Sequence, residues 1–419
     1  MRIAIHDFAG HPFQVQLSRE LAGRGHSVLH LYLRELPGPK GRLERSFQDP
    51  ATFECAPVSL GAPFEKYSML KRHFSHRKYG RVLAERILAF RPDVVLSANT
   101  PIDVQHYLLE RCQQTGTAFV HWMQDLYCRA LRSVLTQKLG ACALPLANHY
   151  ECLERRVCAR SGAVVFITPD FQTATAQMNF RPARSAVIEN WAPLDDVVVT
   201  HKQNAWSARH GLAGKLVYLY SGTLGLKHKP DLLYRLAAAL EGSDALVVVV
   251  SEGLGRTHLD QLQQRARLRN LLLLDFQPYA EMSSVFGAAD VLLGILDGEA
   301  GVFAVPSKIL SYLCAGRAIL LAAPKNNLAA RTVIRAEAGV VADPEDVEGF
   351  IRGAKWMAGE PELRRTFAEN ARRYAVTAFD IHAIAAQFES VLREAVEATA
   401  RRQHRTNTHT PAYSRVAAG

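Results

Sequence analysis

Residues 298–323 read GEAGVFAVPSKILSYLCAGRAILLAA, and this stretch decides the fold class. The apolar run 291–296 before it predicts a buried strand, Pro306 suits the first turn of a helix, and Gly316 ends that helix before a second apolar strand. The inward face of the helix is apolar at Ile309, Leu310 and Leu313. The stretch is therefore one strand–loop–helix–strand unit of an α/β domain.

The start of this helix suits a phosphate or a diphosphate. First-turn amides have no partner inside the helix, and the helix dipole places its positive end there. Ser307 and Lys308 add a hydroxyl and a mobile cation at the same end. In the structural alternative, Ser307 only caps the helix and Lys308 is only solvated, and the local pattern leaves both interpretations open.

Length and composition predict two domains, because 419 residues with 48% apolar content can fill two cores. Apolar runs long enough to span a membrane are missing from the sequence, and the opening MRIAIHDF enters a strand directly, so we expect a cytoplasmic protein without an export signal. The seven cysteines include no Cys-x-x-Cys pair. They argue against a disulfide framework and a structural zinc site, so we expect reduced, mostly buried thiols.

The net charge of +10 is concentrated in two segments. Residues 401–419 hold four arginines and no acid, which predicts a disordered basic tail. Residues 64–78 interleave aromatic and aliphatic side chains with five cations, a pattern that suits an anionic membrane surface. An ordinary helix with inward aromatics and solvated cations is the alternative. Nucleic acid is not expected as a partner, since no recognisable reader motif accompanies the charge.

The first half of the chain alternates strand and helix patterns. The expected strands are 2–8, 27–33, 93–97, 118–124, 163–168 and 186–189, and the expected helices are 13–24, 78–91, 102–113, 145–160 and one that begins at Thr168. Two strand ends carry polar residues at the edge where ligands collect in such sheets, namely Gly10 with His11, and Gln124 with Asp125. Asp125 suits either work on a substrate hydroxyl, as its orienting group or its base, or a helix cap.

Residues 193–214 lack clean periodicity and predict a linker, after which the alternation restarts. The expected strands are 215–221, 245–251 and 271–276, and the expected helices are 230–240, 258–269 and 279–288. We therefore predict a first domain over 1–195, a second over 205–375, and a helix at about 378–397 that packs back on the first domain.

Four turns of the second domain bring polar or basic residues to one edge of its sheet. Besides the loop before Ser307, they carry Gly222, Thr223, Lys227 and Lys229, then Glu252, then Gln277 and Tyr279. The lysines and backbone amides suit a diphosphate, and the shared edge suits one ligand that lies across it.

The ordered series YSGTLGLKHKPDLL, VVVVSEGLG, LLLLDFQPYAEMSSVFGAADVLLGIL and VPSKILSYLCAGRAIL resembles the donor domain of GT-B retaining glycosyltransferases of the family 4 type. The segments GHPFQVQLSRELAGRGHSV, VHWMQDLY and VIENWAPLD are similar to the acceptor domain of enzymes of bacterial exopolysaccharide, colanic-acid and O-antigen biosynthesis. The resemblance covers roughly residues 1–390. It implies two Rossmann-like doubly wound domains that face a central cleft, with a nucleotide-sugar held by the second and an acceptor by the first.

The resemblance also implies roles for individual residues. The donor loop, with Gly301, Val302 and Phe303, and the helix residue Ser311 would contact the nucleotide-sugar. Many relatives carry paired glutamates where this chain has Phe303 and Ser311, so we expect Glu299 to supply the sugar-facing carboxylate. Thr223 replaces a common arginine, which leaves Lys227 and Lys229 as phosphate cations. Gln124 replaces a common histidine before Asp125.

The predicted catalytic set is Asp125, Lys227, Glu299 and Lys308. The expected reaction moves a sugar, with retention, from a nucleoside-diphosphate-sugar to a lipid-linked or saccharide acceptor on the inner face of the cytoplasmic membrane. No Asp-x-Asp motif is seen and lysines can neutralise the diphosphate, so we expect neither a metal nor a cofactor. The alternatives are a GT-B nucleotide-sugar epimerase or phosphorylase, and a catalytically silent nucleotide-sugar-binding assembly protein.

Overall fold

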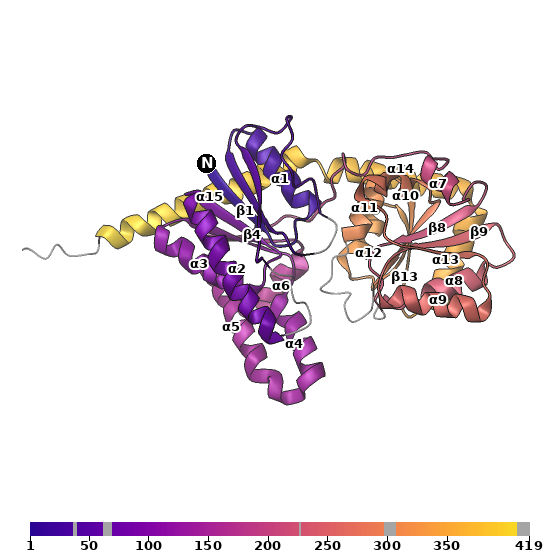
Figure 1. The fold of residues 1–419 in the computed structure, drawn as a ribbon, viewed down its shortest axis with the longest axis horizontal. Helices are drawn as coiled ribbons and strands as arrows, with labels where there is room; N and C mark the ends of the chain where they lie inside the picture. The colour runs from indigo at the N-terminus through magenta and orange to yellow at the C-terminus, as the bar shows by residue number, and fades with distance from the viewer. Residues whose placement is uncertain (37–39, 62–68, 226–227, 297–306, 409–419) are drawn as a thin grey trace, which may run out of the picture. The chain divides into compact units, whose positions relative to one another are not determined.

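A computed structural model describes residues 1–36, 40–61, 69–225, 228–296 and 307–408 (Figure 1). The chain divides into two compact units. The first unit joins Met1–Glu189 to the segment that begins at Ile381, and the second unit is Asn190–Asp380. Each unit is built on one parallel sheet.

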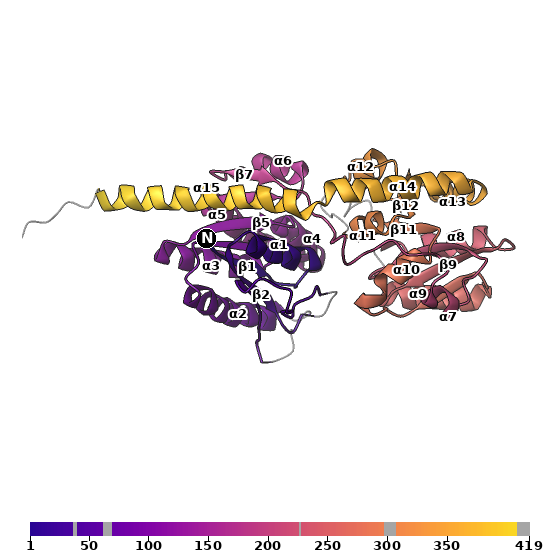
Figure 2. The ribbon, with the colours of Figure 1, turned by 90° about the horizontal axis from the view of Figure 1, so that it is seen from above.

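The first unit contains a seven-stranded sheet in the order β3-β2-β1-β4-β5-β6-β7. Its strands are β1 (Arg2–Asp7), β2 (Ser27–Leu33), β3 (Phe53–Val58), β4 (Val94–Ala98), β5 (Ala118–Met123), β6 (Ala163–Phe166) and β7 (Ser185–Val187). Its helices are α1 (Pro12–Gly23), α2 (Met69–Ala89), α3 (Ile102–Thr115), α4 (Tyr127–Leu139), α5 (Leu144–Arg160), α6 (Pro169–Gln177) and α15 (Ile381–Thr408), with a 3-10 turn η1 (Gly140–Ala143). Helix α15 packs on α1 and β5, while α2, α3 and α5 cover the other face (Figure 2).

The second unit contains a six-stranded sheet in the order β10-β9-β8-β11-β12-β13. Its strands are β8 (Leu216–Ser221), β9 (Ala245–Val250), β10 (Leu271–Leu274), β11 (Val291–Ile295), β12 (Ala318–Ala322) and β13 (Gly339–Ala342). Its helices are α7 (Ala205–Arg209), α8 (Asp231–Ala239), α9 (Leu254–Ala266), α10 (Met282–Gly287), α11 (Ser307–Ala315), α12 (Leu328–Arg335), α13 (Val347–Gly359) and α14 (Pro361–Ala378), with a 3-10 turn η3 (Tyr279–Glu281).

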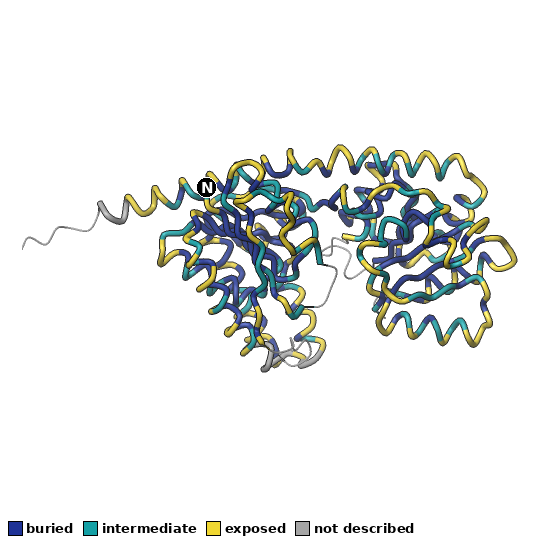
Figure 3. Tube along the Cα trace, turned by 45° about the horizontal axis from the view of Figure 1, so that its top comes forward, coloured by how far each residue is buried: buried dark blue, intermediate teal, exposed yellow. Residues whose placement is uncertain are grey.

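Burial explains why the central strands are continuous apolar runs. Every residue of β4, β5, β11 and β12 is buried, because helices cover both faces of each sheet (Figure 3). All strand pairs are parallel, as in the pairing of Ile3 with Val94 and of Val291 with Ala318. The predicted fold of two Rossmann-like parallel sheets is confirmed.

The prediction of a linker over residues 193–214 is wrong. The segment contains α7, and Trp206 of that helix is buried and donates from Nε1 to Gln277 Oε1 at 2.9 Å. Asn204 caps α7 through reciprocal bonds with Ser207. The apolar residues of the 193–214 segment are too scattered to form a periodic sequence pattern. The segment nevertheless belongs to the second unit.

Other elements also differ from the expected ones. Strands β3 and β13 and helices α4, α12, α13 and α14 were not predicted. Helix α2 begins at Met69 and α9 at Leu254, before the expected starts at residues 78 and 258. Helix α15 continues through Thr408, so the first residues of the expected tail at 401–408 are helical, and residues 409–419 lie outside the described part of the chain.

The basic segment 64–78 is described only from Met69, where α2 begins. The ring of Phe74 is 67% exposed, so this aromatic does not pack inward as the ordinary-helix alternative expects. Lys78 donates from Nζ to the carbonyl of Leu60 at 2.8 Å. Within the described ranges, the helices lack the length and apolarity to cross a membrane. All seven cysteines are free thiols, and four of them are buried, in agreement with the expected burial of most of the thiols.

Candidate functional site

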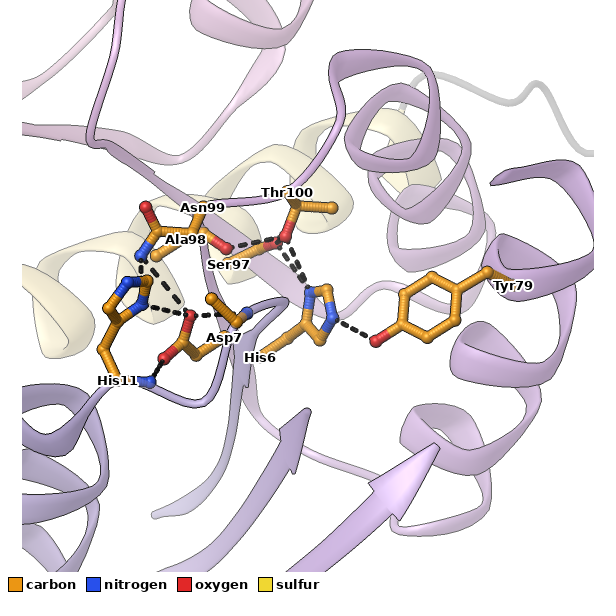
Figure 4. Close-up of polar contacts among 9 residues, drawn as sticks. His6, Asp7, His11, Tyr79, Ser97, Ala98, Asn99 and Thr100 are labelled. Atoms are coloured by element: carbon orange, nitrogen blue, oxygen red, sulfur yellow. Dashed lines mark hydrogen bonds and ion pairs between the residues drawn. The ribbon is translucent and has the colours of Figure 1, made fainter. Parts of the chain in front are cut away.

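The loop between β1 and α1 is organised by a buried carboxylate (Figure 4). Asp7 ends β1 with its side chain fully buried, and it accepts the backbone N–H groups of Ala9, at 3.1 Å, and of His11. The imidazole Nδ1 of His11 lies 3.2 Å from Asp7 Oδ1. Asn99, which follows β4, donates from Nδ2 to Asp7 Oδ1 at 3.4 Å. The carboxylate thereby fixes both the backbone and the side chain of His11.

Charge pairing sets the protonation of this pair. Burial alone would raise the pKa of Asp7, but His11 holds it below its ordinary value. Burial alone would lower the pKa of His11, but Asp7, helped by Asp125, raises it. Both groups are therefore stabilised in their charged forms.

A second buried network holds β1, β4 and α2 together without charge. Thr100 donates its hydroxyl proton to the carbonyl of Ala98 at 2.7 Å. Because a hydroxyl has only one proton, Thr100 acts as the acceptor in its 3.0 Å hydrogen bond with Nδ1 of His6. Nε2 of His6 then accepts the hydroxyl of Tyr79 at 2.8 Å. Burial lowers the pKa of His6 to about 3, so its ring is neutral. Figure 4 places this network beside the Asp7–His11 pair.

Gln124 and Asp125 follow β5 and line a cavity of 270 Å³ in the same unit. Gln124 is buried, while Asp125 reaches solvent at the surface. Surrounding protein nevertheless raises the pKa of Asp125 to about 6, against the opposing effect of His11. A carboxylate with this pKa is a better proton acceptor than an ordinary aspartate.

Glu154 explains how the chain turns after Asp125. Its buried carboxylate accepts the backbone N–H groups of Tyr127 at 3.1 Å and Cys128 at 2.8 Å, the first residues of α4. Glu154, which lies on α5, therefore caps the start of α4, and Asp125 does not act as the cap. The helix-capping alternative for Asp125 is not what the structure uses.

Lys308 lies in the first turn of α11, at the carboxyl edge of the second sheet. Its ammonium donates to the hydroxyl of Tyr220 at 2.6 Å and lies 3.9 Å from the centre of that ring. Tyr220 in turn donates to the carbonyl of Thr223 at 3.0 Å. Burial lowers the pKa of Lys308 to about 7, since no carboxylate of the described residues offsets the loss of water.

Gly222 gives Lys308 its space. The backbone of Gly222 has φ of +130°, and a Cβ atom there would lie 3.1 Å from Nζ of Lys308. A side chain would therefore be strained and would also press on the ammonium. The hydroxyl of Tyr312 holds the preceding residue, Ser221, by accepting its N–H at 3.0 Å and donating to its carbonyl at 3.2 Å.

Other predicted residues of the second unit have structural partners. Lys229 forms an ion pair with Glu345, and Gln277 accepts from Trp206. Tyr279 donates to Asp196 Oδ2 at 3.1 Å. These contacts hold Gln277 and Tyr279 against the 193–214 segment and give Lys229 a carboxylate partner.

For the remaining predicted site residues, the structure gives the position and the degree of exposure. Thr223, Glu252 and Ser307 are exposed at their strand or helix ends, and Ser311 is half-buried on α11. Five predicted residues lie outside the described residues: Lys227, Glu299, Gly301, Val302 and Phe303. In the described part of the chain, no three His, Cys, Asp or Glu side chains are grouped to hold a metal ion.

The sequence analysis did not predict Asp7, Asn99 and Tyr220, nor the supporting residues His6, Tyr79, Thr100, Glu154 and Tyr312. Asp7 and Asn99 lie at the carboxyl ends of β1 and β4, so their position next to strand ends was a usable signal. Tyr220 lies within an apolar strand and is indistinguishable there from a core residue.

Two parallel Rossmann-like sheets, each with polar residues at the carboxyl ends of its strands, define the GT-B class of architecture. Residues 11–191 match the family model for the glycosyl transferase 4-like domain, and residues 202–374 match that for glycosyl transferases group 1. The chain therefore belongs to the GT-B glycosyltransferases of the family 4 type.

Individual relatives are distant. The chain is 25% identical over 180 residues to the putative colanic acid biosynthesis glycosyl transferase WcaI of Escherichia coli K12, and the match covers 43% of each protein. Among solved structures, sucrose-phosphate synthase from Thermosynechococcus elongatus has a TM-score of 0.72 at 15% identity, over 95% of this chain and 100% of that one. Anabaena HepE in complex with UDP-glucose has a TM-score of 0.65 at 16% identity, over 94% and 99%. These two likenesses show the shared fold alone.

Proposed function

We propose that this protein transfers a sugar from a nucleoside-diphosphate-sugar to a lipid-linked or saccharide acceptor in cell-surface polysaccharide biosynthesis, with retention of anomeric configuration. The observation that carries the proposal is the half-buried ammonium of Lys308, at the start of α11 and against Gly222. A cation in the first turn of a helix, where backbone amides have no partner inside the helix, suits a diphosphate. The UDP-glucose bound to HepE and the colanic-acid role in the name of WcaI agree with this choice.

In the proposed reaction, the bond between the anomeric carbon and the diphosphate oxygen breaks. A bond from the acceptor hydroxyl to that carbon forms on the same face, and the hydroxyl proton passes to the departing diphosphate. Lys308 stabilises the charge that develops on this leaving group, which is the main electrostatic task of the protein. Asp125 orients the acceptor hydroxyl, and the Asp7–His11 pair fixes the adjacent loop.

The test is a thermal-shift screen of nucleoside diphosphates, followed by hydrolysis assays with the sugar nucleotides of the base that binds. A ligand at 100 times its dissociation constant stabilises a protein by about 2.7 kcal/mol, which such a screen detects. Binding with slow hydrolysis is expected. Binding without any turnover would favour the silent assembly protein, and the failure of every nucleotide to bind would reject the proposal.

We also propose reversible attachment to an anionic membrane through the segment 64–78. Its five cations at about 1 kcal/mol each, together with apolar side chains such as Phe74, suffice for salt-sensitive binding. Co-sedimentation with anionic vesicles should weaken at high salt and in a variant with serine at Lys71, Arg72 and Arg77. Lys78 is kept, since it holds the backbone of Leu60. Binding that survives these changes and disappears on truncation after Ala400 would assign attachment to the tail instead.

A further inference from the structure

The cavity beside Asp125 has features that the proposed transfer does not by itself explain. It opens at the carboxyl ends of β4 and β5, and its volume is 270 Å³. Apolar walls come from Phe8, Ile102 and Trp122, and polar groups come from Gln105, His121 and Asp125. An apolar surface with a few convergent polar groups is typical of a small-molecule site.

Two of these polar side chains are buried without partners. Among the described residues, neither ring nitrogen of His121 has a hydrogen-bond partner, nor has Oε1 of Gln105. The two residues are only 4% and 1% exposed. Burial lowers the pKa of His121 to about 3, so its neutral ring offers one donor and one acceptor. A buried polar group without a partner costs about 1–3 kcal/mol, so hydroxyl groups of a ligand would be bound favourably here.

The charges around the cavity select against anions. None of its described lining residues is Lys or Arg, and Asp125, with a pKa of about 6, is mostly ionised at neutral pH. A phosphate or a sugar carboxylate would face this negative charge, and the cation of the described residues that interacts with Asp125, protonated His11, is already paired with Asp7. Hydroxyl groups instead donate to Asp125 and Gln105 and form either kind of bond with His121.

The size of the cavity narrows the ligand further. Pockets for drug-sized molecules have volumes of about 300–1,000 Å³, so 270 Å³ suits one ring and not a nucleotide or an oligosaccharide. We propose that this cavity binds a single uncharged sugar ring, the terminal unit of the acceptor. The identification of that ring with the acceptor rests on the proposed transferase function, whereas the preference for an uncharged sugar rests on the cavity alone.

The test uses the full-length protein and a panel of monosaccharides. Glucose, galactose and N-acetylglucosamine are the uncharged probes, and glucuronate and glucose 1-phosphate are their anionic counterparts. Binding is followed through the indole N–H signal of Trp122 in NMR spectra, assigned with a Trp122→Phe variant. At least one uncharged sugar should shift this signal, and neither anion should. The absence of a shift with every uncharged sugar, or an equal shift with glucuronate, would overturn the proposal.

Variants locate the site. Gln105→Leu and His121→Phe should weaken sugar binding by about fivefold or more, the equivalent of one lost hydrogen bond of about 1 kcal/mol. Gln114→Leu is the matched control, because Gln114 lies exposed on the same helix as Gln105. Gln105→Leu keeps the test decisive if His121→Phe does not fold. Equal affinities in wild type and Gln105→Leu, or equal losses in Gln114→Leu, would refute the assignment.

Nucleoside-diphosphate affinity, measured in the same samples, separates the two proposals. Sugar binding without nucleotide binding would reject the transferase function and leave the cavity as a sugar site. Nucleotide binding without sugar binding would reject the cavity site alone.

Discussion

The two sheets carry opposite charges at corresponding edges. At the end of β1, the buried carboxylate of Asp7 is held by backbone amides and by His11. At the end of β8, the half-buried ammonium of Lys308 contacts the hydroxyl and ring of Tyr220, with no carboxylate of the described chain beside it. One edge is thus neutralised internally, while the other keeps a cation that its described neighbours do not compensate.

This difference agrees with the proposal that each unit binds a different ligand. A strand end with an internally satisfied carboxylate shapes a loop and does not attract a strong anion. A strand end with a partly buried cation that its described neighbours do not compensate gains most from a ligand that brings negative charge. We therefore expect the diphosphate to bind the second unit and the uncharged partner to bind the first, and each experiment below tests one part of this expectation.

Removal of the cation should have the largest effect. Lys308→Ala should weaken nucleoside-diphosphate binding by tenfold or more, because a charge-assisted contact contributes about 1.5–3 kcal/mol. Isothermal titration calorimetry measures the change. Lys355→Ala is the control, since Lys355 is exposed on α13. Unchanged affinity in Lys308→Ala would remove the phosphate site from this edge.

Removal of the Asp7 carboxylate should reduce the stability of the protein and leave nucleotide binding unchanged. Asp7→Asn should lower the free energy of unfolding by about 1–2 kcal/mol, because charge-assisted bonds become neutral ones. The pKa of Asp7 is lower in the folded protein than in the unfolded chain. The stabilisation by Asp7 is therefore fully present above its pKa in the unfolded chain, and it is lost as the pH falls through its pKa in the folded protein. The pKa of His11 is raised above its ordinary value of 6.5 in the folded protein. The stabilisation by His11 is therefore fully present below pH 6.5, and it is lost as the pH rises through the pKa of His11 in the folded protein.

The difference between wild type and Asp7→Asn should thus be greatest at mildly acidic pH. Urea unfolding across pH measures it, and NMR titration of His11 should show a lower pKa in the variant. A His11 pKa that is the same in both proteins would contradict the pairing.

The pH dependence of nucleotide binding should follow Lys308. Its pKa of about 7 means that the free protein loses this charge as pH rises through 7. Binding of a diphosphate favours the ammonium and takes up a proton, so affinity should fall with rising pH, by at most about tenfold per pH unit. In the Lys308→Arg variant the side chain stays charged over the whole pH range. Its nucleotide affinity should therefore lose the pH dependence that the titration of Lys308 causes. An equal slope in both proteins would assign the titration to another group.

Removal of metal ions should have the smallest effect. A cationic site neutralises the diphosphate without a divalent ion, so sugar transfer or hydrolysis should continue in EDTA. Activity that disappears in EDTA and returns with magnesium or manganese would show that Lys308 does not act alone.

Sequence patterns predicted the parts of the molecule that are regular. Continuous apolar runs predicted the central strands, because parallel strands buried on both faces leave no other pattern. Strand β3 was missed because FECAPV is half-exposed and contains Pro57 at a sheet edge. Helix α4 follows a polar turn closely and is capped by Glu154, a residue far along the chain, so no local cap signals its start.

The site was predictable where chemistry follows a strand directly. Gly222 and Lys308 were predicted, and the structure brings them together. The partner of Lys308, Tyr220, and the ion pair of Lys229 with Glu345 depend on residues distant in sequence. Such pairings are set by tertiary packing, which periodicity and spacing do not encode.

Helix α15 has a consequence for the synthesis of the chain. Phe388 of this helix is buried against Trp122, with ring centres 4.6 Å apart, and Glu389 pairs with Arg24 at 2.9 Å. The first unit thus needs residues that the ribosome adds only after the whole second unit. Domains usually fold in order as they emerge from the ribosome. Here the second unit can finish first, while the nascent first unit keeps an apolar face, including Trp122, uncovered until translation is almost complete.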